Sequence, residues 1–305
     1  MRQMINVYEN LDQNKRKSWV VVLGFFVFVT GIIYLVGQLL GSGPEMIILA
    51  LVFSFLTSFA GYWWGDKIIL ATAGARPAAK KRDFVFYTVV ENLTLAANLP
   101  QPRLYVVEDS APNAFTTGRD PQHATICATT WLLEKLDRTE LEGVVAHELA
   151  NIRNYDMRLM TVVAVLVGMI TLLADWLIRA RIWGDRGDRG DRNQGIEMVF
   201  VLIGVVLILL SPLIAQLIQL AISRRREFLA DASGVMITRY PEGLARALEK
   251  ISADREILEV ANKATAHLYI TDPLKSQKNA VGWFAHLFTT HPPVTERIKA
   301  LREME

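Results

Sequence analysis

Three residues whose side chains could bind a metal ion or transfer a proton lie in the run His147-Glu148-Leu149-Ala150-Asn151, namely His147, Glu148 and Asn151. Side chains four residues apart project from the same face of a helix, so positions 147 and 151 would be neighbours. In zinc hydrolases this spacing carries two histidine ligands, and the intervening glutamate acts as general base. Because position 151 is asparagine, the run alone is a weak indication of a metal site. A polar patch on a helix surface is the alternative.

A helix must carry these residues, and the preceding sequence predicts where it begins. Thr139-Glu140-Leu141-Glu142 fits a capping box, with Glu142 three residues after Thr139. Apolar residues at helical spacing follow, at Leu141, Val144, Val145, Leu149 and Ile152. Around this helix we expect a helix over Phe84–Ala97, strands over Arg103–Val107 and 124–129, and helices starting near Pro241 and Pro293.

The chain is also rich in long apolar segments. It has 305 residues, of which 51% are hydrophobic and only 21% are charged. Since a membrane-spanning helix needs about 20 mostly apolar residues, four spans are predicted, at residues 19–40, 46–64, 159–178 and 198–222. The alternative is a set of core helices in a soluble protein. The predicted organisation is an N-terminal segment (1–18), a first hairpin (19–64), a second hairpin (159–222) and a catalytic domain in two parts (66–158 and 223–305).

The basic residues near the span ends predict an orientation. Lys15, Arg16 and Lys17 precede the first span, whereas the turn of the first hairpin has no basic residue. More basic residues follow the second and fourth spans. By the positive-inside rule, both termini and the catalytic domain should be cytoplasmic. Five arginines in the loop of the second hairpin (179–194) oppose this orientation, and we interpret that loop as a solvated, charge-mixed segment.

Composition excludes several other classes of protein. Lys and Arg total 33 against 31 Asp and Glu, so the net charge of +2 provides no broad basic surface for nucleic acid. The one cysteine, Cys127, cannot form an internal disulfide, and its apolar surroundings favour a core residue over a nucleophile. Asp175 is the only formally charged residue inside the spans, which argues against a transporter.

Four motifs, in this order and with this arrangement of spans, resemble those of the HtpX-type membrane zinc metalloproteases, relatives of the CAAX prenyl endoproteases. The resemblance extends over nearly the whole chain. The motifs are Ala111-Pro112-Asn113-Ala114-Phe115-Thr116-Thr117-Gly118, His147-Glu148-Leu149-Ala150, Arg226-Glu227-Phe228-Leu229-Ala230-Asp231 after the fourth span, and His291-Pro292-Pro293 with Glu296-Arg297. The implied fold is a mainly α membrane protein with four transmembrane helices in two hairpins and a cytoplasmic α+β, zincin-like metalloprotease domain with a small sheet.

The resemblance implies a role for each matching residue. His147 and Glu227 would be zinc ligands, Glu148 the general base, and Asn151 occupies the position of the second histidine ligand. Asp231 would hold a histidine ligand through its other ring nitrogen, and His291 would donate to the developing oxyanion. An edge strand containing Asn113, Ala114 and Phe115 would receive an extended peptide. The alternatives are ion pairs for Glu227 and Asp231, a structural His291 and a simple surface loop at 113–117.

The implied function is a zinc endopeptidase, with one zinc ion per chain, in the bacterial inner membrane. Its partners would be polypeptide substrates, including unfolded or misfolded membrane proteins on the cytoplasmic side, and the lipid bilayer; its role would be protein quality control. An amide is a weak ligand compared with imidazole, so Asn151 predicts poor zinc binding and slow or absent cleavage. The alternatives are a catalytically inactive pseudo-protease that binds polypeptide segments and a structural membrane protein.

Overall fold

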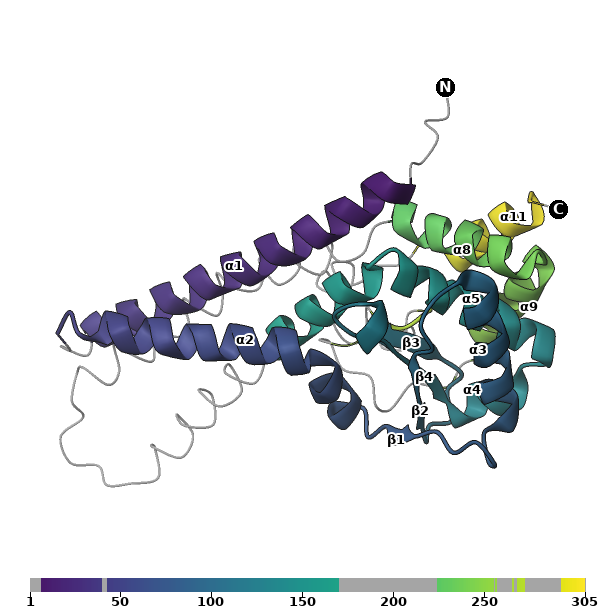
Figure 1. Ribbon diagram of the computed structural model, residues 1–305, viewed down its shortest axis with the longest axis horizontal. Coiled ribbons are helices and arrows are strands. Elements are labelled where there is room, and N and C mark those ends of the chain that lie inside the picture. Colours follow the sequence, from purple (N-terminus) through teal and green to yellow (C-terminus); the bar gives the residue numbers. More distant parts are fainter. Residues whose placement is uncertain are drawn as a thin grey trace.

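The computed structural model describes residues 7–39, 43–169, 224–254 and 292–304, together with 256, 265 and 268–271. Two long helices, α1 (Val7–Leu39) and α2 (Met46–Thr72), run side by side away from the rest of the described chain (Figure 1). Both are long and apolar enough to cross a membrane. Each is longer than the predicted span: α1 already begins within the polar N-terminal segment, and α2 continues for two turns beyond Trp64.

A third helix, at residues 156–169, contains the start of the predicted third span and packs against both long helices. Val163 and Leu166 lie in one apolar cluster with Phe25 of α1. Gly61 and Gly65 of α2 allow a close approach, because a Cβ at Gly65 would lie 3.0 Å from Thr161 Cγ2. The rest of that span, the fourth span and the arginine-rich loop lie outside the described residues.

A four-stranded sheet has the order β1-β2-β4-β3. β2 and β4 are parallel, whereas β1 pairs with β2 and β3 with β4 in antiparallel fashion. β3 therefore lies at an edge of the sheet. Segment 268–271 covers part of this edge, because Phe115 forms a bridge with Tyr269. The strands are β1 (Arg76–Pro77), β2 (Arg103–Val107), β3 (Ala114–Thr117) and β4 (Thr125–Thr129), with the short helix η1 (Pro121–His123) between the last two.

Three of the remaining helices pack directly against α5 (Arg138–Arg153), which carries the predicted metal-binding run. Its apolar stripe is buried as predicted, with Val145, Leu149 and Ile152 each no more than 1% exposed. Together with the small mixed sheet, this confirms the prediction of a mainly helical protein. The other helices are α3 (Phe84–Ala97), α4 (Thr130–Lys135), α8 (Arg224–Thr238), α9 (Pro241–Ala253) and α11 (Val294–Arg302).

The predicted capping box at the start of α5 was wrong by two residues. The helix begins at Arg138, and Asp137 is its N-cap. The Asp137 carboxylate accepts a hydrogen bond from the Glu140 backbone N–H at 2.9 Å, and Glu140 Oε2 accepts one from the Asp137 N–H at 2.8 Å. A carboxylate at the N-cap also interacts favourably with the helix dipole, which favours Asp137 over Thr139.

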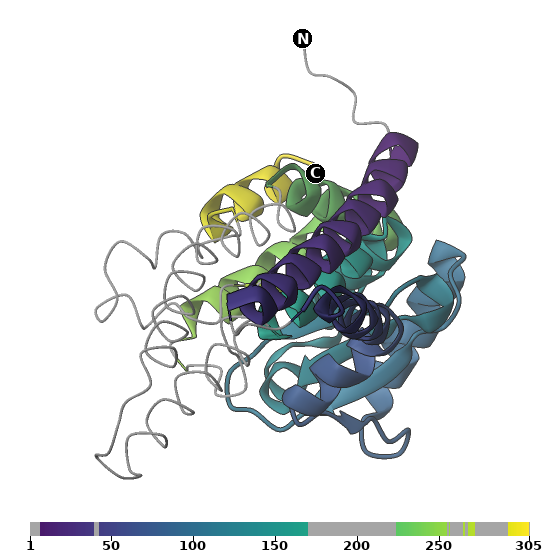
Figure 2. The same cartoon turned by 90° about the vertical axis from the view of Figure 1, so that its left-hand side faces the viewer.

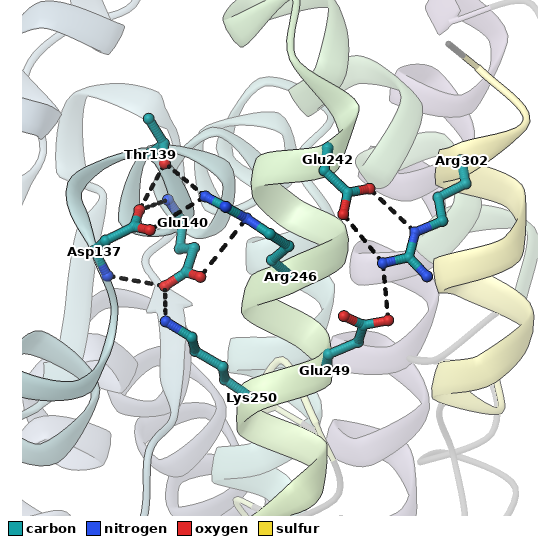
Figure 3. Close-up of polar contacts among 8 residues, drawn as sticks. All are labelled: Asp137, Thr139, Glu140, Glu242, Arg246, Glu249, Lys250 and Arg302. Carbon is teal, nitrogen blue, oxygen red and sulfur yellow. Dashed lines mark hydrogen bonds and ion pairs between the residues drawn. The ribbon is translucent and has the colours of Figure 1, made fainter.

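Ion pairs hold α9 between α5 and α11 (Figure 3). Glu140, buried at the start of α5, accepts a hydrogen bond from Lys250 Nζ of α9 at 2.7 Å. On the other side of α9, the Arg302 guanidinium forms ion pairs with the carboxylates of Glu242 and Glu249, with N···O distances of 3.1 and 2.9 Å. These contacts fix α11 relative to the helix that carries His147.

Candidate functional site

His147 lies where α5 and α8 are in closest contact. A Cβ at Gly234 of α8 would be only 3.0 Å from the His147 backbone nitrogen, so the glycine allows this approach. The imidazole is buried, and its Nδ1 lies 2.8 Å from Asp231 Oδ1. Asp231 therefore fixes the ring orientation and directs Nε2 away from itself. Burial alone would lower the pKa of His147, but the hydrogen bond to Asp231 and the charges of Asp231 and Glu227 together outweigh it, and the net pKa is raised.

Glu227 lies on the other side of the imidazole, one helical turn before Asp231 on α8. Its Oε2 is 3.9 Å from His147 Nε2. The alternative prediction was that Glu227 only pairs with the arginines that precede it. Instead Arg226 pairs with Asp156 at 3.2 Å, while Glu227 faces His147 and Arg297.

A buried arginine that the sequence analysis gave no role completes this group. Arg297 of α11 is 0% exposed. Its Nε and one terminal nitrogen donate to the two oxygens of Asp231 at 2.8 and 2.7 Å, and the other terminal nitrogen donates to the Ile270 carbonyl at 2.9 Å. That nitrogen also lies 3.3 Å from Glu227 Oε2. Burial would raise the pKa of Asp231, but Arg297 and His147 more than offset this, and the pKa is lowered.

Glu148 points toward β3 rather than toward α8. Thr116 Oγ1 of β3 donates a hydrogen bond to Glu148 Oε2 at 2.8 Å. The glutamate is 1% exposed. Burial raises its pKa, and the nearby charge of His147 and the bond from Thr116 only partly oppose this shift. A carboxyl group with a raised pKa suits proton transfer near neutral pH.

The residues present fit a divalent cation, with one weak ligand. Two ligands of a tetrahedral zinc ion lie about 3.4 Å apart, close to the 3.9 Å between His147 Nε2 and Glu227 Oε2. Glu227 and Asp231 share one buried guanidinium, that of Arg297, so the carboxylates near His147 are not fully neutralised by it. Within the described residues, however, no group of three or more His, Cys, Asp or Glu side chains could hold a metal. The candidate ligands are one imidazole, one carboxylate and the Asn151 amide.

The predicted peptide-binding residues lie on the covered part of the sheet edge. Asn113 Nδ2 donates to the Thr271 carbonyl at 3.2 Å, and the Ile270 N–H donates to the Ala114 carbonyl at 3.0 Å. The Phe115 and Tyr269 rings meet edge to face at 5.1 Å. An incoming peptide would therefore have to displace residues 268–271 to pair with this part of β3, since Thr116 and Thr117 are also buried. His291 lies outside the described residues.

A second buried polar cluster lies at the end of α5, and sequence reasoning assigned it no role. Asn14 of α1 donates to the Asn154 carbonyl at 3.0 Å and to Asp156 Oδ1 at 2.8 Å. Arg226 donates to the same Asp156 oxygen and to Asn14 Oδ1. Burial raises the pKa of Asp156 to about 6 despite the charge of Arg226. The sequence signal that could have indicated this cluster is the pair of polar residues, Asn154 and Asp156, just after the metal-binding run.

Comparisons with known proteins identify the family of this chain. Residues 81–305 match the model of Peptidase family M48. Relatives named protease HtpX homolog include one from Thermoanaerobacter pseudethanolicus, 42% identical over 98% of both chains, and one from Streptococcus thermophilus, 41% identical over 98% of this chain and 100% of the relative. A crystal structure of S. mikatae Ste24p aligns with a TM-score of 0.50 and 17% sequence identity, and the alignment covers 96% of this chain and 67% of the Ste24p chain. This likeness supports the overall fold. The chain therefore belongs to peptidase family M48, and the resemblance to the HtpX-type proteases is confirmed.

Proposed function

We propose that this chain is a membrane-anchored zinc endopeptidase whose catalytic power is reduced by Asn151. Its substrates would be unfolded or misfolded segments of membrane proteins, in the service of protein quality control. The catalytic domain and both termini would lie on the cytoplasmic side of a bacterial inner membrane, with four spans in two hairpins. Membership of family M48 supports peptide-bond hydrolysis, and the apolar helices α1 and α2 support the membrane anchor.

The observation that carries the proposal is the pairing of His147 Nε2 and Glu227 Oε2 at 3.9 Å beside a buried glutamate. His147 and Glu227 would hold the zinc ion, and Asn151 would be a weak third ligand. When bound, zinc would polarise the scissile carbonyl and lower the pKa of the attacking water to about 7. Asp231 would keep His147 in position by accepting the Nδ1 proton.

Glu148 would accept a proton from the attacking water and pass it to the leaving amine. Its hydrogen bond from Thr116 links this carboxylate to β3, where Ala114 and Phe115, with Asn113 just before the strand, would receive the substrate. An extended substrate along this edge would place its backbone next to Glu148. His291 would donate a hydrogen bond to the developing oxyanion.

Asn151 weakens this machinery in two ways. It replaces an imidazole with a neutral amide, and its proximity lowers the pKa of Glu148, the carboxylate that must accept the proton. Both effects favour an alternative function, in which the chain is a pseudo-protease that binds polypeptide segments without cutting them.

The test compares the chain with its Asn151→His variant in cleavage of an unfolded model protein in detergent with added zinc. We expect the histidine variant to cut at least 10–100-fold faster and a chelator to stop it. Adding Glu148→Gln to that variant should abolish cleavage while zinc remains bound, which separates loss of the base from loss of the metal. If Asn151→His is folded and binds zinc but does not cut, the endopeptidase proposal fails and the pseudo-protease remains. If the unmodified chain cuts as fast as Asn151→His, the proposed effect of Asn151 is wrong.

A further inference from the structure

A cavity of about 430 Å³ lies beside the C-terminal half of α2 and has no part in the proposed chemistry. One wall is aromatic and comes from α2, whereas the opposite wall comes from β2 and the loop between β3 and β4. The residues that matter to the argument are Phe59, Trp63, Trp64, Lys67, Arg103 and Arg119.

The position of this cavity along α2 places it at a membrane surface. From Met46 to Trp64, a rise of about 1.5 Å per residue gives roughly 27 Å, close to the ~30 Å thickness of a hydrocarbon core. Residues such as Leu49, Val52 and Phe53 on this stretch are more than half exposed, as lipid-facing side chains would be. Trp63 and Trp64 then lie at the interface, where tryptophan is enriched. Lys67 lies one turn farther, at the level of the headgroups.

The charges around the cavity leave a positive excess. Arg103 pairs with Asp66, and Arg119 lies 3.4 Å from Asp120 while its guanidinium stacks 4.7 Å from the Trp63 ring centre. Lys67 is exposed, and among the described residues no carboxylate lies within ion-pair distance of it. The three cations exceed the two carboxylates, so an anion at this site would meet net positive charge next to an aromatic wall.

We propose that this cavity binds the phosphate-bearing headgroup of an anionic membrane phospholipid. Lys67 and Arg119 would contact the phosphate, and the acyl chains would follow the exposed face of α2 past Phe59. This inference rests on the proposed placement of α2 across the membrane, but it does not depend on cleavage.

The site also has a structural link to the catalytic residues. Arg119 follows Gly118, whose N–H donates to Thr161 Oγ1 at 3.1 Å, and Gly118 follows directly on β3. β3 carries Thr116, which bonds Glu148. A bound headgroup would therefore contact the loop next to the strand that supports the general base.

The experiment uses the full chain in a neutral maltoside detergent, titrated with dioctanoyl phosphatidylglycerol or dioctanoyl phosphatidylcholine and followed by native mass spectrometry. We expect the first phosphatidylglycerol to bind more tightly than phosphatidylcholine. Lys67→Gln should weaken the phosphatidylglycerol complex about five-fold, and Lys67→Glu about 25-fold, because each unit of charge near anionic lipid contributes a similar factor. The matched control is Lys81→Gln, which removes another exposed lysine outside the cavity and should change nothing.

Three results would overturn the lipid site. The first is equal binding of the two lipids, and the second is an equal loss in Lys67→Gln and Lys81→Gln, which would indicate a general charge effect. The third is displacement of the lipid by inorganic phosphate at similar concentration, which would indicate a site for soluble anions. Cleavage by Asn151→His is measured separately, so a failed lipid site with intact cleavage leaves the proposed function standing. A chain that does not insert into bilayers at all would refute the membrane placement itself.

Discussion

Replacing Arg297 tests whether the buried ion network supports the candidate metal site. Arg297 is 0% exposed and makes three hydrogen bonds of 2.7–2.9 Å, two of them to Asp231. In Arg297→Met the side chain keeps an apolar shape of similar length but loses the guanidinium. The carboxylates of Asp231 and Glu227 then remain buried without their main counter-charge.

The expected cost follows from that burial. Removing one partner of a buried ion pair costs about 3–5 kcal/mol, because the remaining charge cannot return to water. For a chain of this length, each kcal/mol shifts the unfolding midpoint by about 2 °C, so the midpoint should fall by roughly 6–10 °C. The measurement is thermal unfolding in detergent, followed by tryptophan fluorescence. Because Asp231 orients His147, the affinity of Asn151→His for zinc should also fall when Arg297→Met is added.

Arg302→Met is the matched control on the same helix. Its side chain is 45% exposed and pairs with Glu242 and Glu249 at the surface of α9. Such exposed pairs contribute about 0–1 kcal/mol, so the control should shift the midpoint by no more than about 2 °C. If Arg297→Met and Arg302→Met produce the same small shift, the buried network does not stabilise the site and the reasoning is refuted.

Two further predictions follow from the same helices. Gly143→Ala should destabilise the protein by at least about 1–3 kcal/mol, because its Cβ would lie 2.5 Å from the Leu244 backbone nitrogen of α9. The control is Gly31→Ala in α1, where the Cβ would meet nothing within 4 Å. This control should not lower the unfolding midpoint. Zinc affinity should fall with decreasing pH, since a proton on His147 excludes the metal and Asp231 raises the pKa of that histidine above its usual 6.5. Zinc titrations from pH 5 to 9 would contradict this if affinity were constant or rose toward acid.

The sequence predicted the secondary structure around the site well because the signals were local. The helix over Phe84–Ala97 and the strand over Arg103–Val107 have the predicted bounds, and β4 starts one residue later than predicted. Hydrophobic periodicity also identified the buried face of α5. The N-cap of α5 was predicted wrongly, because Asp137 and Thr139 are both good capping residues and only the three-dimensional structure distinguishes them.

The neighbours of the site residues could not be predicted from the sequence, because they depend on the tertiary structure. The sequence places Asp231 one turn after Glu227, but nothing local indicates that Arg297, 66 residues later, bonds both oxygens of Asp231. Likewise the segment 268–271 is far from β3 in sequence, yet Tyr269 pairs with Phe115 on the edge expected to receive a substrate. Contacts of this kind depend on how α8, α11 and the sheet pack, and periodicity carries no information about that packing.

Helix α1 provides more than the predicted first span, because a buried cluster connects the part of α1 before that span to the site. Asn14 of α1 is 2% exposed and donates hydrogen bonds to Asn154 and Asp156, which follow α5. Arg226 of α8 donates hydrogen bonds to Asn14 and Asp156. Figures 1 and 2 show α1 passing α8. Arg226 directly precedes Glu227, so the α8 turn that presents the candidate ligand is held partly by a residue of α1. Arg226 is one of the basic residues that follow the predicted fourth span and favour a cytoplasmic orientation, yet it is 8% exposed and its charge faces Asp156. Separating the catalytic part from α1 would expose this cluster and release the turn that holds Glu227.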